Sequence, residues 1–82
     1  MKNQMDNSID TKIVKFGKRE AEILKALRDG LRNREIAKRL DINQKTVSTY
    51  IGRAKEKLGL SKKDNTYKLV VYALPSLEIN HK

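Results

Sequence analysis

The sequence contains no cysteine, no tryptophan and a single proline, and its longest apolar run extends only from Leu69 to Leu74. Without cysteine, the chain can form neither a disulfide framework nor a thiolate metal site. The apolar run is far too short to cross a bilayer, and the polar segment 1–12 lacks the apolar core of a secretion signal. We therefore expect no membrane insertion, and a small fold that depends on helix packing in a reducing, cytoplasmic setting.

Acidic residues are also scarce. The 82 residues include 10 Asp and Glu against 19 Lys and Arg, which gives a formal net charge of +9. A chain of this length has room for one small domain. Its positive charge favours polyanionic partners, with nucleic acid ahead of an anionic membrane surface or an acidic protein.

Candidate catalytic groups are sparse as well. The only histidine, His81, lies in a polar terminal segment, no glycine-rich phosphate loop is present, and the acidic residues show no paired spacing. These features predict that the protein is not an enzyme and needs no metal or cofactor.

Apolar residues recur at helical spacing along most of the chain, which predicts an all-α fold of four helices. The first helix begins at Lys18 and stops at Gly30, a residue suited to left-handed backbone geometry. The second, with Asn33 as its expected N-cap, ends at Leu40.

A sharp turn is predicted next. Asp41 tolerates a left-handed conformation and Asn43 is a strong N-cap for a third helix, which Gly59 ends. The inward stripe of this helix is expected to be Val47, Ile51, Ala54 and Leu58.

A fourth helical segment precedes Pro75, which disfavours helix at Leu74 and beyond. Its predicted inward stripe is Tyr67, Val70, Val71 and Leu74. The other flank is apolar too, and is interpreted either as part of a fully packed helix or as a partner surface. We therefore divide the chain into a flexible arm (1–15), a folded domain (16–75) and a tail (76–82).

A short helix, a tight turn and a longer helix form a helix-turn-helix, in which the second helix enters the major groove of DNA. The outward positions of the third helix carry amide, hydroxyl and cationic groups that can bond base edges, and Gly52 permits close approach of the backbone. Nearby cations could neutralise phosphates. The predicted DNA-binding residues are Arg34, Lys38, Asn43, Gln44, Lys45, Thr46, Ser48, Thr49, Tyr50, Gly52 and Arg53.

Four ordered blocks, "FGKREAEIL", "GLRNREIAKRL", "INQKTVSTY" and "KLGL", resemble the DNA-binding domain of the LuxR/GerE family, which is also the output domain of NarL/FixJ-type response regulators. The resemblance implies a four-helix bundle that binds double-stranded DNA as a homodimer, commonly through the fourth helix. The dimer surface would then include Leu69, Tyr72 and Ala73.

The sequence departs from the family pattern at several positions. Gly17 and Arg32 stand where the family carries capping hydroxyl residues, and Ser48 and Gly52 stand where many relatives carry lysine, so any base preference should differ. The link "SKKDNTYK" fits the family spacing poorly. No receiver or ligand-binding domain precedes residue 16, so the chain is expected to be of the stand-alone type.

Two other interpretations remain. "RAKEKL" also resembles a sigma factor region 4 module, and the fold could instead serve a co-regulator that binds RNA polymerase or a larger transcription factor. The interpretation we favour is a small, cytoplasmic, nucleoid-associated transcriptional regulator.

Overall fold

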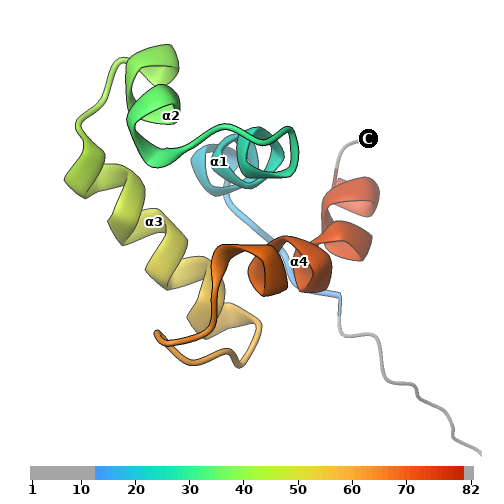
Figure 1. The fold of residues 1–82 in the computed structure, drawn as a ribbon. Coiled ribbons are helices and arrows are strands. Elements are labelled where there is room, and N and C mark those ends of the chain that lie inside the picture. The colour runs from blue at the N-terminus through green and yellow to red at the C-terminus, as the bar shows by residue number, and fades with distance from the viewer. Residues whose placement is uncertain (1–12, 81–82) are drawn as a thin grey trace, which may run out of the picture.

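The computed structural model describes residues 13–80, and these residues form four helices and no strand. The predicted all-α class is therefore confirmed. Figure 1 shows α2 and α3 on one side of α1 and α4 on the other, and α1 packs against all three of its neighbours. The helices are α1 (Lys18–Arg28), α2 (Asn33–Leu40), α3 (Gln44–Lys57) and α4 (Thr66–Asn80).

The core lies where the four helices meet around α1. On α3 the predicted stripe is confirmed at Val47, Ile51 and Ala54, which are buried, while Leu58 at the end of the helix is only half-buried. Burying a side chain such as leucine or isoleucine contributes about 1.5–3 kcal/mol, so this shared core is the main source of stability. Its largest fully buried apolar side chains are Ile23, Leu24, Ile36, Val47, Leu69 and Leu77.

The first turns of α1 and α2 are held by glutamates rather than by N-cap side chains. Glu20 Oε1 accepts a hydrogen bond from the Gly17 N–H at 2.9 Å, and Glu35 Oε1 accepts one from the Arg32 N–H at 2.8 Å. The N-cap of α2 is Arg32, so the prediction that Asn33 caps this helix was wrong. Because Glu35 satisfies the N-cap N–H from inside the helix, the start of α2 does not need a side-chain cap at that position.

Glu20, which is buried, also forms an ion pair with the exposed Lys57, and this pair joins α1 to the end of α3. Its Oε1 lies 2.6 Å from Lys57 Nζ, and Lys57 also donates to the Lys15 carbonyl and stands over the Phe16 ring. Burial acts to raise the pKa of Glu20, but the hydrogen bonds from Lys57 and Gly17 together with nearby positive charges outweigh it, so the pKa lies below its ordinary value.

This pair predicts a pH-dependent effect of Lys57→Met. A carboxyl with a lowered pKa adds stability above its ordinary pKa near 4.5, and that stability is lost as the pH falls through the folded-state pKa. Removing Lys57 should cost about 1–3 kcal/mol at neutral pH, because Glu20 is left buried without its cation. Urea unfolding across the acid range should show this difference shrinking as Glu20 becomes protonated in both proteins. A difference that stays constant with pH, or that persists unchanged in a Glu20→Gln background, would contradict it.

The fourth helix turns a different face inward from the one predicted. Leu69, Ala73 and Leu77 are buried, whereas Tyr67 and Val71 of the predicted stripe are exposed. The expectation that Leu69 and Ala73 lie on a partner surface was therefore wrong, because both side chains are fully buried in the core of the monomer. Of the three predicted dimer residues, only Tyr72 is exposed.

The fourth helix also continues past Pro75, which lies inside it, so the expectation that helix ends near this residue was wrong. A proline within a helix removes one backbone hydrogen bond and bends the helix rather than always ending it. Figure 1 shows α4 changing direction along its length. Burial of the Leu77 side chain beyond the proline offsets that loss.

The segment before α1 is hydrogen-bonded to this last part of α4. The Val14 N–H donates to Ser76 Oγ at 2.8 Å, and the Val14 side chain packs against the core. The predicted flexible arm (1–15) therefore does not extend as far as Val14, and its residues 1–12 lie outside the described part of the chain.

Candidate nucleic-acid interface

The turn between α2 and α3 has the geometry that its residues predict. Asp41 adopts the left-handed conformation (φ 58°, ψ 48°), and the Ile42 N–H donates to the Ala37 carbonyl at 2.9 Å. Asn43 caps α3, since its Oδ1 accepts from the Thr46 N–H at 2.8 Å and from the Thr46 hydroxyl at 2.9 Å. The predictions for Asp41 and for Asn43 as a cap are confirmed. Together these two residues determine where α3 begins.

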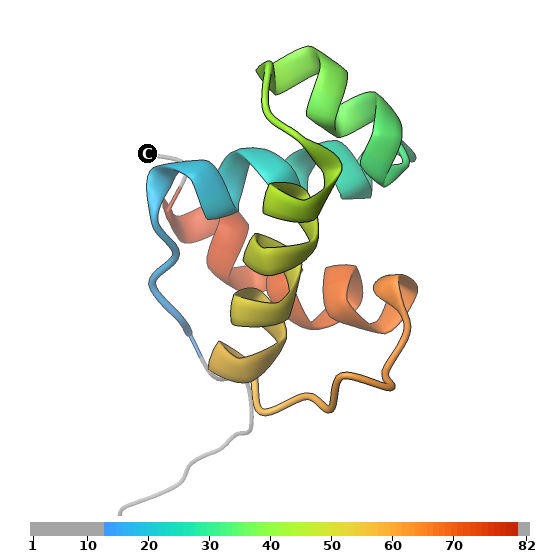
Figure 2. The same cartoon turned by 90° about the vertical axis from the view of Figure 1, so that its left-hand side faces the viewer.

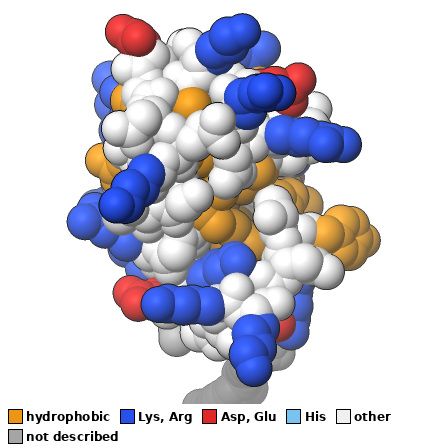
Figure 3. All heavy atoms as spheres, turned by 60° about the vertical axis from the view of Figure 1, so that its left-hand side comes forward, with side chains coloured by type: hydrophobic (Ala, Val, Ile, Leu, Met, Phe, Trp, Pro, Cys, Tyr) orange, Lys and Arg blue, Asp and Glu red, His pale blue; other side chains and the backbone are white. Residues whose placement is uncertain are grey.

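The outer face of α3 forms a shallow polar groove. Figure 2 shows α3 facing the viewer along its whole length, with α2 at one end and the segment leading to α4 at the other. Five of the predicted DNA-binding residues line this groove together with Glu56 and Lys62. In Figure 3, on the side of the molecule that carries α2 and α3, Lys and Arg side chains surround a mainly uncharged polar surface. The five residues are Lys45, Ser48, Thr49, Gly52 and Arg53.

A second groove lies between the amino-terminal ends of α2 and α3. Arg34 and Gln44, both predicted to bind DNA, line it with Arg32, Asn33 and Glu35. Asn33 Nδ2 also approaches Ser48 Oγ across the two helices at 3.4 Å, and Asn33 and Ser48 line a third groove further along α3. Seven of the eleven predicted residues, from α2 and α3, therefore line these three grooves.

Four predicted residues lie outside these grooves. Lys38 is exposed on α2, whereas Asn43 and Thr46 bond each other in the cap. Tyr50 is half-buried, and the Arg53 guanidinium stands 5.6 Å from the centre of its ring. This cation–π contact limits the directions in which Arg53 can extend.

Gly52 has no structural partner that would explain a glycine in the middle of α3. A Cβ added at this position would meet no atom within 4 Å, apart from the helix backbone around it. Glycine in a helix interior costs about 1 kcal/mol relative to alanine. The fold therefore carries this cost without any packing benefit.

Asn33 and Lys62 are among the residues of these grooves that the predicted DNA-binding set did not include. Asn33 was interpreted only as a cap, and Lys62 only as part of a poorly matching link. The polar amide of Asn33 and the positive charge of Lys62 were visible in the sequence, but nothing in the local pattern shows that the link folds back beside α3. Lys62 lines two of the grooves, together with Ser48 and Gly52 in each case.

Within residues 13–80 there is no group of three or more His, Asp or Glu side chains able to hold a metal ion. None of the described helices has the length and apolarity needed to cross a bilayer. The grooves are open, polar and basic, which is the character of a surface for binding a large polyanion rather than of an enclosed catalytic pocket.

A short helix, a turn with one left-handed residue and a longer helix with a polar outer face define a helix-turn-helix protein. Residues 14–71, more than half of the chain, match the GerE family model of bacterial regulatory proteins of the luxR family. The chain belongs to this family and is a DNA-binding transcription regulator. No curated protein and no solved structure gives a significant match to it.

Proposed function

We propose that the protein binds specific double-stranded DNA sequences as a homodimer in the bacterial cytoplasm, on the nucleoid, with α3 in the major groove. The observation that carries the proposal is the outer face of α3, where hydrogen-bonding side chains meet basic ones and no bulky apolar side chain intervenes. Base edges in the major groove present distinct patterns of donors and acceptors, and such a face can distinguish them.

The roles of the side chains follow from their chemistry. Gln44 at the start of α3 can bond an adenine edge bidentately, Lys45 can reach guanine, and Ser48 and Thr49 can bond several base edges. The Thr49 hydroxyl already donates to the Lys45 carbonyl at 3.0 Å, which leaves its lone pairs and its methyl group to face the DNA. Arg34, Lys38 and Arg53 would bind phosphates, which adds affinity without sequence preference.

The homodimer would form through the exposed strip of α4 that consists of Tyr67, Val71 and Tyr72. Their exposed fractions are 77%, 43% and 49%, so this is apolar and aromatic surface left uncovered in the monomer. None of these three residues lines the grooves of α2 and α3, since they line a separate groove with residues 63–65 and 68, so a second copy seated on this strip would leave the grooves of α2 and α3 free. Two reading helices related by a two-fold axis would then face two half-sites.

Selection of bound duplexes from a random pool, at about physiological salt, tests the proposal. Enrichment of a two-fold symmetric motif with half-sites about one helical turn apart is the expected result. Sedimentation should show a dimer that Tyr72→Ala weakens. Equal affinity for all sequences would contradict sequence reading, and would favour the alternative of a co-regulator that binds RNA polymerase or another transcription factor through the same strip, or a promoter module like sigma region 4.

Gly52→Ala is expected to change stability and DNA binding in opposite directions. The added methyl meets nothing in the protein, so the gain in helix propensity should stabilise the fold by about 0.5–1 kcal/mol and raise the melting temperature by a few degrees. The same methyl would occupy the space where we place the edge of the DNA, and should weaken binding to the selected operator. A more stable variant with unchanged affinity would show that DNA does not approach α3 closely at this residue.

A further inference from the structure

We infer that the α3–α4 linker (residues 61–65) forms a third part of the DNA interface, in which Lys62 binds a backbone phosphate beside the carboxyl-terminal half of α3. The inference rests on the proposed docking of α3 in the major groove. It adds a contact from a segment that is neither helix of the helix-turn-helix.

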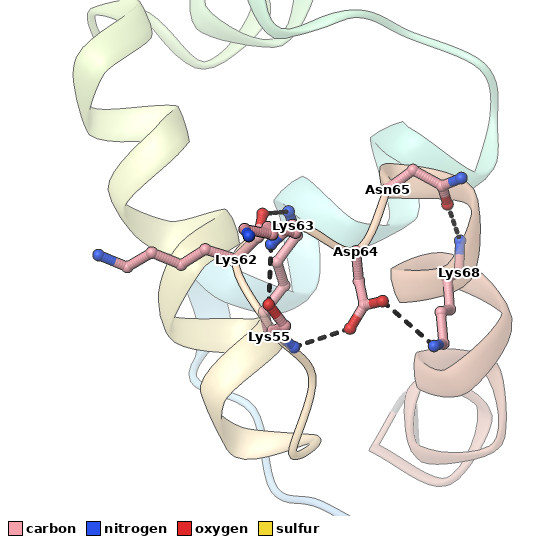
Figure 4. A network of polar contacts seen from close by, with 7 residues as sticks. Lys55, Lys62, Lys63, Asp64, Asn65 and Lys68 are labelled. Carbon is pink, nitrogen blue, oxygen red and sulfur yellow. Dashed lines mark hydrogen bonds and ion pairs between the residues drawn. The ribbon is translucent and has the colours of Figure 1, made fainter.

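The linker is held in a defined shape by its own hydrogen bonds (Figure 4). Asp64 accepts from the Ser61 N–H at 2.7 Å and from Lys68 Nζ at 3.1 Å, and Ser61 Oγ accepts from the Lys63 N–H at 3.0 Å. The hydrogen bond from the Ser61 N–H and the contact with Lys68 favour the ionised carboxylate of Asp64 and lower its pKa.

The linker is also tied to α3 directly. Lys55 Nζ donates to the Lys62 carbonyl at 3.3 Å, which fixes the backbone of Lys62 against the helix that would read the DNA. The Lys55 ammonium group is held by this bond, whereas the Lys62 ammonium group forms no hydrogen bond with the described residues. A lysine on an ordered loop loses less conformational entropy on binding than one on a flexible loop.

The Lys62 side chain extends away from α4 and across α3 in Figure 4. It lines the outer groove of α3 with Gly52 and Arg53, and it also lines the neighbouring groove that contains Asn33 and Ser48. A duplex seated on α3 would bring phosphates to the edges of these grooves. An ammonium group on a long stem is suited to bind one of them as a point charge.

Lys63 provides a matched control, because it is the next residue but lines a different groove, against Tyr67 and Tyr72 on α4. Both lysines are exposed, and either alanine variant removes one positive charge from the linker. Overall charge therefore cannot explain a difference between them. Neither change should alter the melting temperature, since neither side chain contributes to the core. Because Lys63 lines the groove beside the α4 strip, sedimentation must also show that the dimer fraction of Lys63→Ala equals that of the wild type.

The experiment measures binding of the full chain to a labelled duplex about two helical turns long that carries the selected operator, at several salt concentrations. Lys62→Ala should weaken binding about three- to tenfold at low salt and reduce the salt slope by about one for each bound protomer, whereas Lys63→Ala should change affinity less than twofold. Neutral methylphosphonate scanning should then find one phosphate whose replacement weakens the wild type but not Lys62→Ala.

The outcomes separate this inference from the function it rests on. If the wild type binds the duplex and the two alanine variants behave alike, the linker contact is wrong while the docking of α3 stands. A wild type that binds no duplex overturns both. Lys62→Ala could also weaken binding while every methylphosphonate replacement lowers the affinity of the wild type and of Lys62→Ala equally. Lys62 would then act through the general electrostatic field of the protein, and the specific phosphate contact would be wrong.

Discussion

Replacing Lys45 and Arg53 together with alanine is expected to weaken DNA binding roughly 10- to 100-fold at low salt, and to lower the slope of affinity against salt by about two for each bound protomer. Both side chains are exposed, and they lie along one groove on the outer face of α3. Each would release about one counterion from DNA on binding, so their combined loss removes two such terms. Titrations of a labelled duplex at several salt concentrations measure both quantities.

The matched control is Lys18→Ala with Arg28→Ala, which removes the same charge from the two ends of α1. Neither residue lines the grooves described above, although both are exposed. At a net charge of +9, the general field of the protein alone would attract DNA, and the control measures this effect. Equal losses in the two double variants would show that DNA binds through overall charge and not through α3.

A melting curve must accompany the double variant, because Arg53 also contacts the protein. Its guanidinium stands over the ring of Tyr50, and its charge acts on the buried Glu20. An exposed cation–π contact contributes about 0.5–1 kcal/mol, so a small loss of stability is expected. Unfolding would leave fewer active molecules but the same salt slope, and the change in slope therefore separates the two effects.

The turn and the start of α3 were predictable because their geometry depends on neighbouring residues. Asp41 tolerates a left-handed conformation by itself, and Asn43 reaches an N–H three residues ahead. The stripe of Val47, Ile51 and Ala54 could also be predicted, since the positions between them carry no aliphatic side chain and the helix has one apolar face. Local physics decides all of these features.

The inward face of α4 could not be chosen on that basis. Most residues from Tyr67 to Leu74 are apolar, so two opposite faces fit a helical stripe equally well. The contact of α4 with α1, which is distant in sequence, determines which face is buried. Leu77 also belongs to the buried face, but Pro75 before it made a helix at this position unexpected. The position of Lys62 beside α3 was unpredictable for the same reason, since it depends on the path of a loop and not on a repeating pattern.

Leu69→Ala is expected to destabilise the protein by about 2–5 kcal/mol, because it removes a fully buried side chain from the contact between α4 and the rest of the core. A domain of this size has a total stability of roughly 4–12 kcal/mol, so the loss is a large part of the whole. The melting temperature should fall by more than about 10 °C. Chemical and thermal unfolding, followed by helical circular dichroism, measure the change.

Val71→Ala is the matched control for the orientation of α4. It lies on the same helix but on the exposed face, so it should change monomer stability by less than about 0.5 kcal/mol. Its effect should appear instead in the dimer fraction if a second copy covers the strip of Tyr67, Val71 and Tyr72. A larger loss from Val71→Ala than from Leu69→Ala, measured at a concentration where the protein is monomeric, would mean that α4 turns its other face to the core. The strip of α4 would then be core rather than surface, and the dimer would have to form elsewhere.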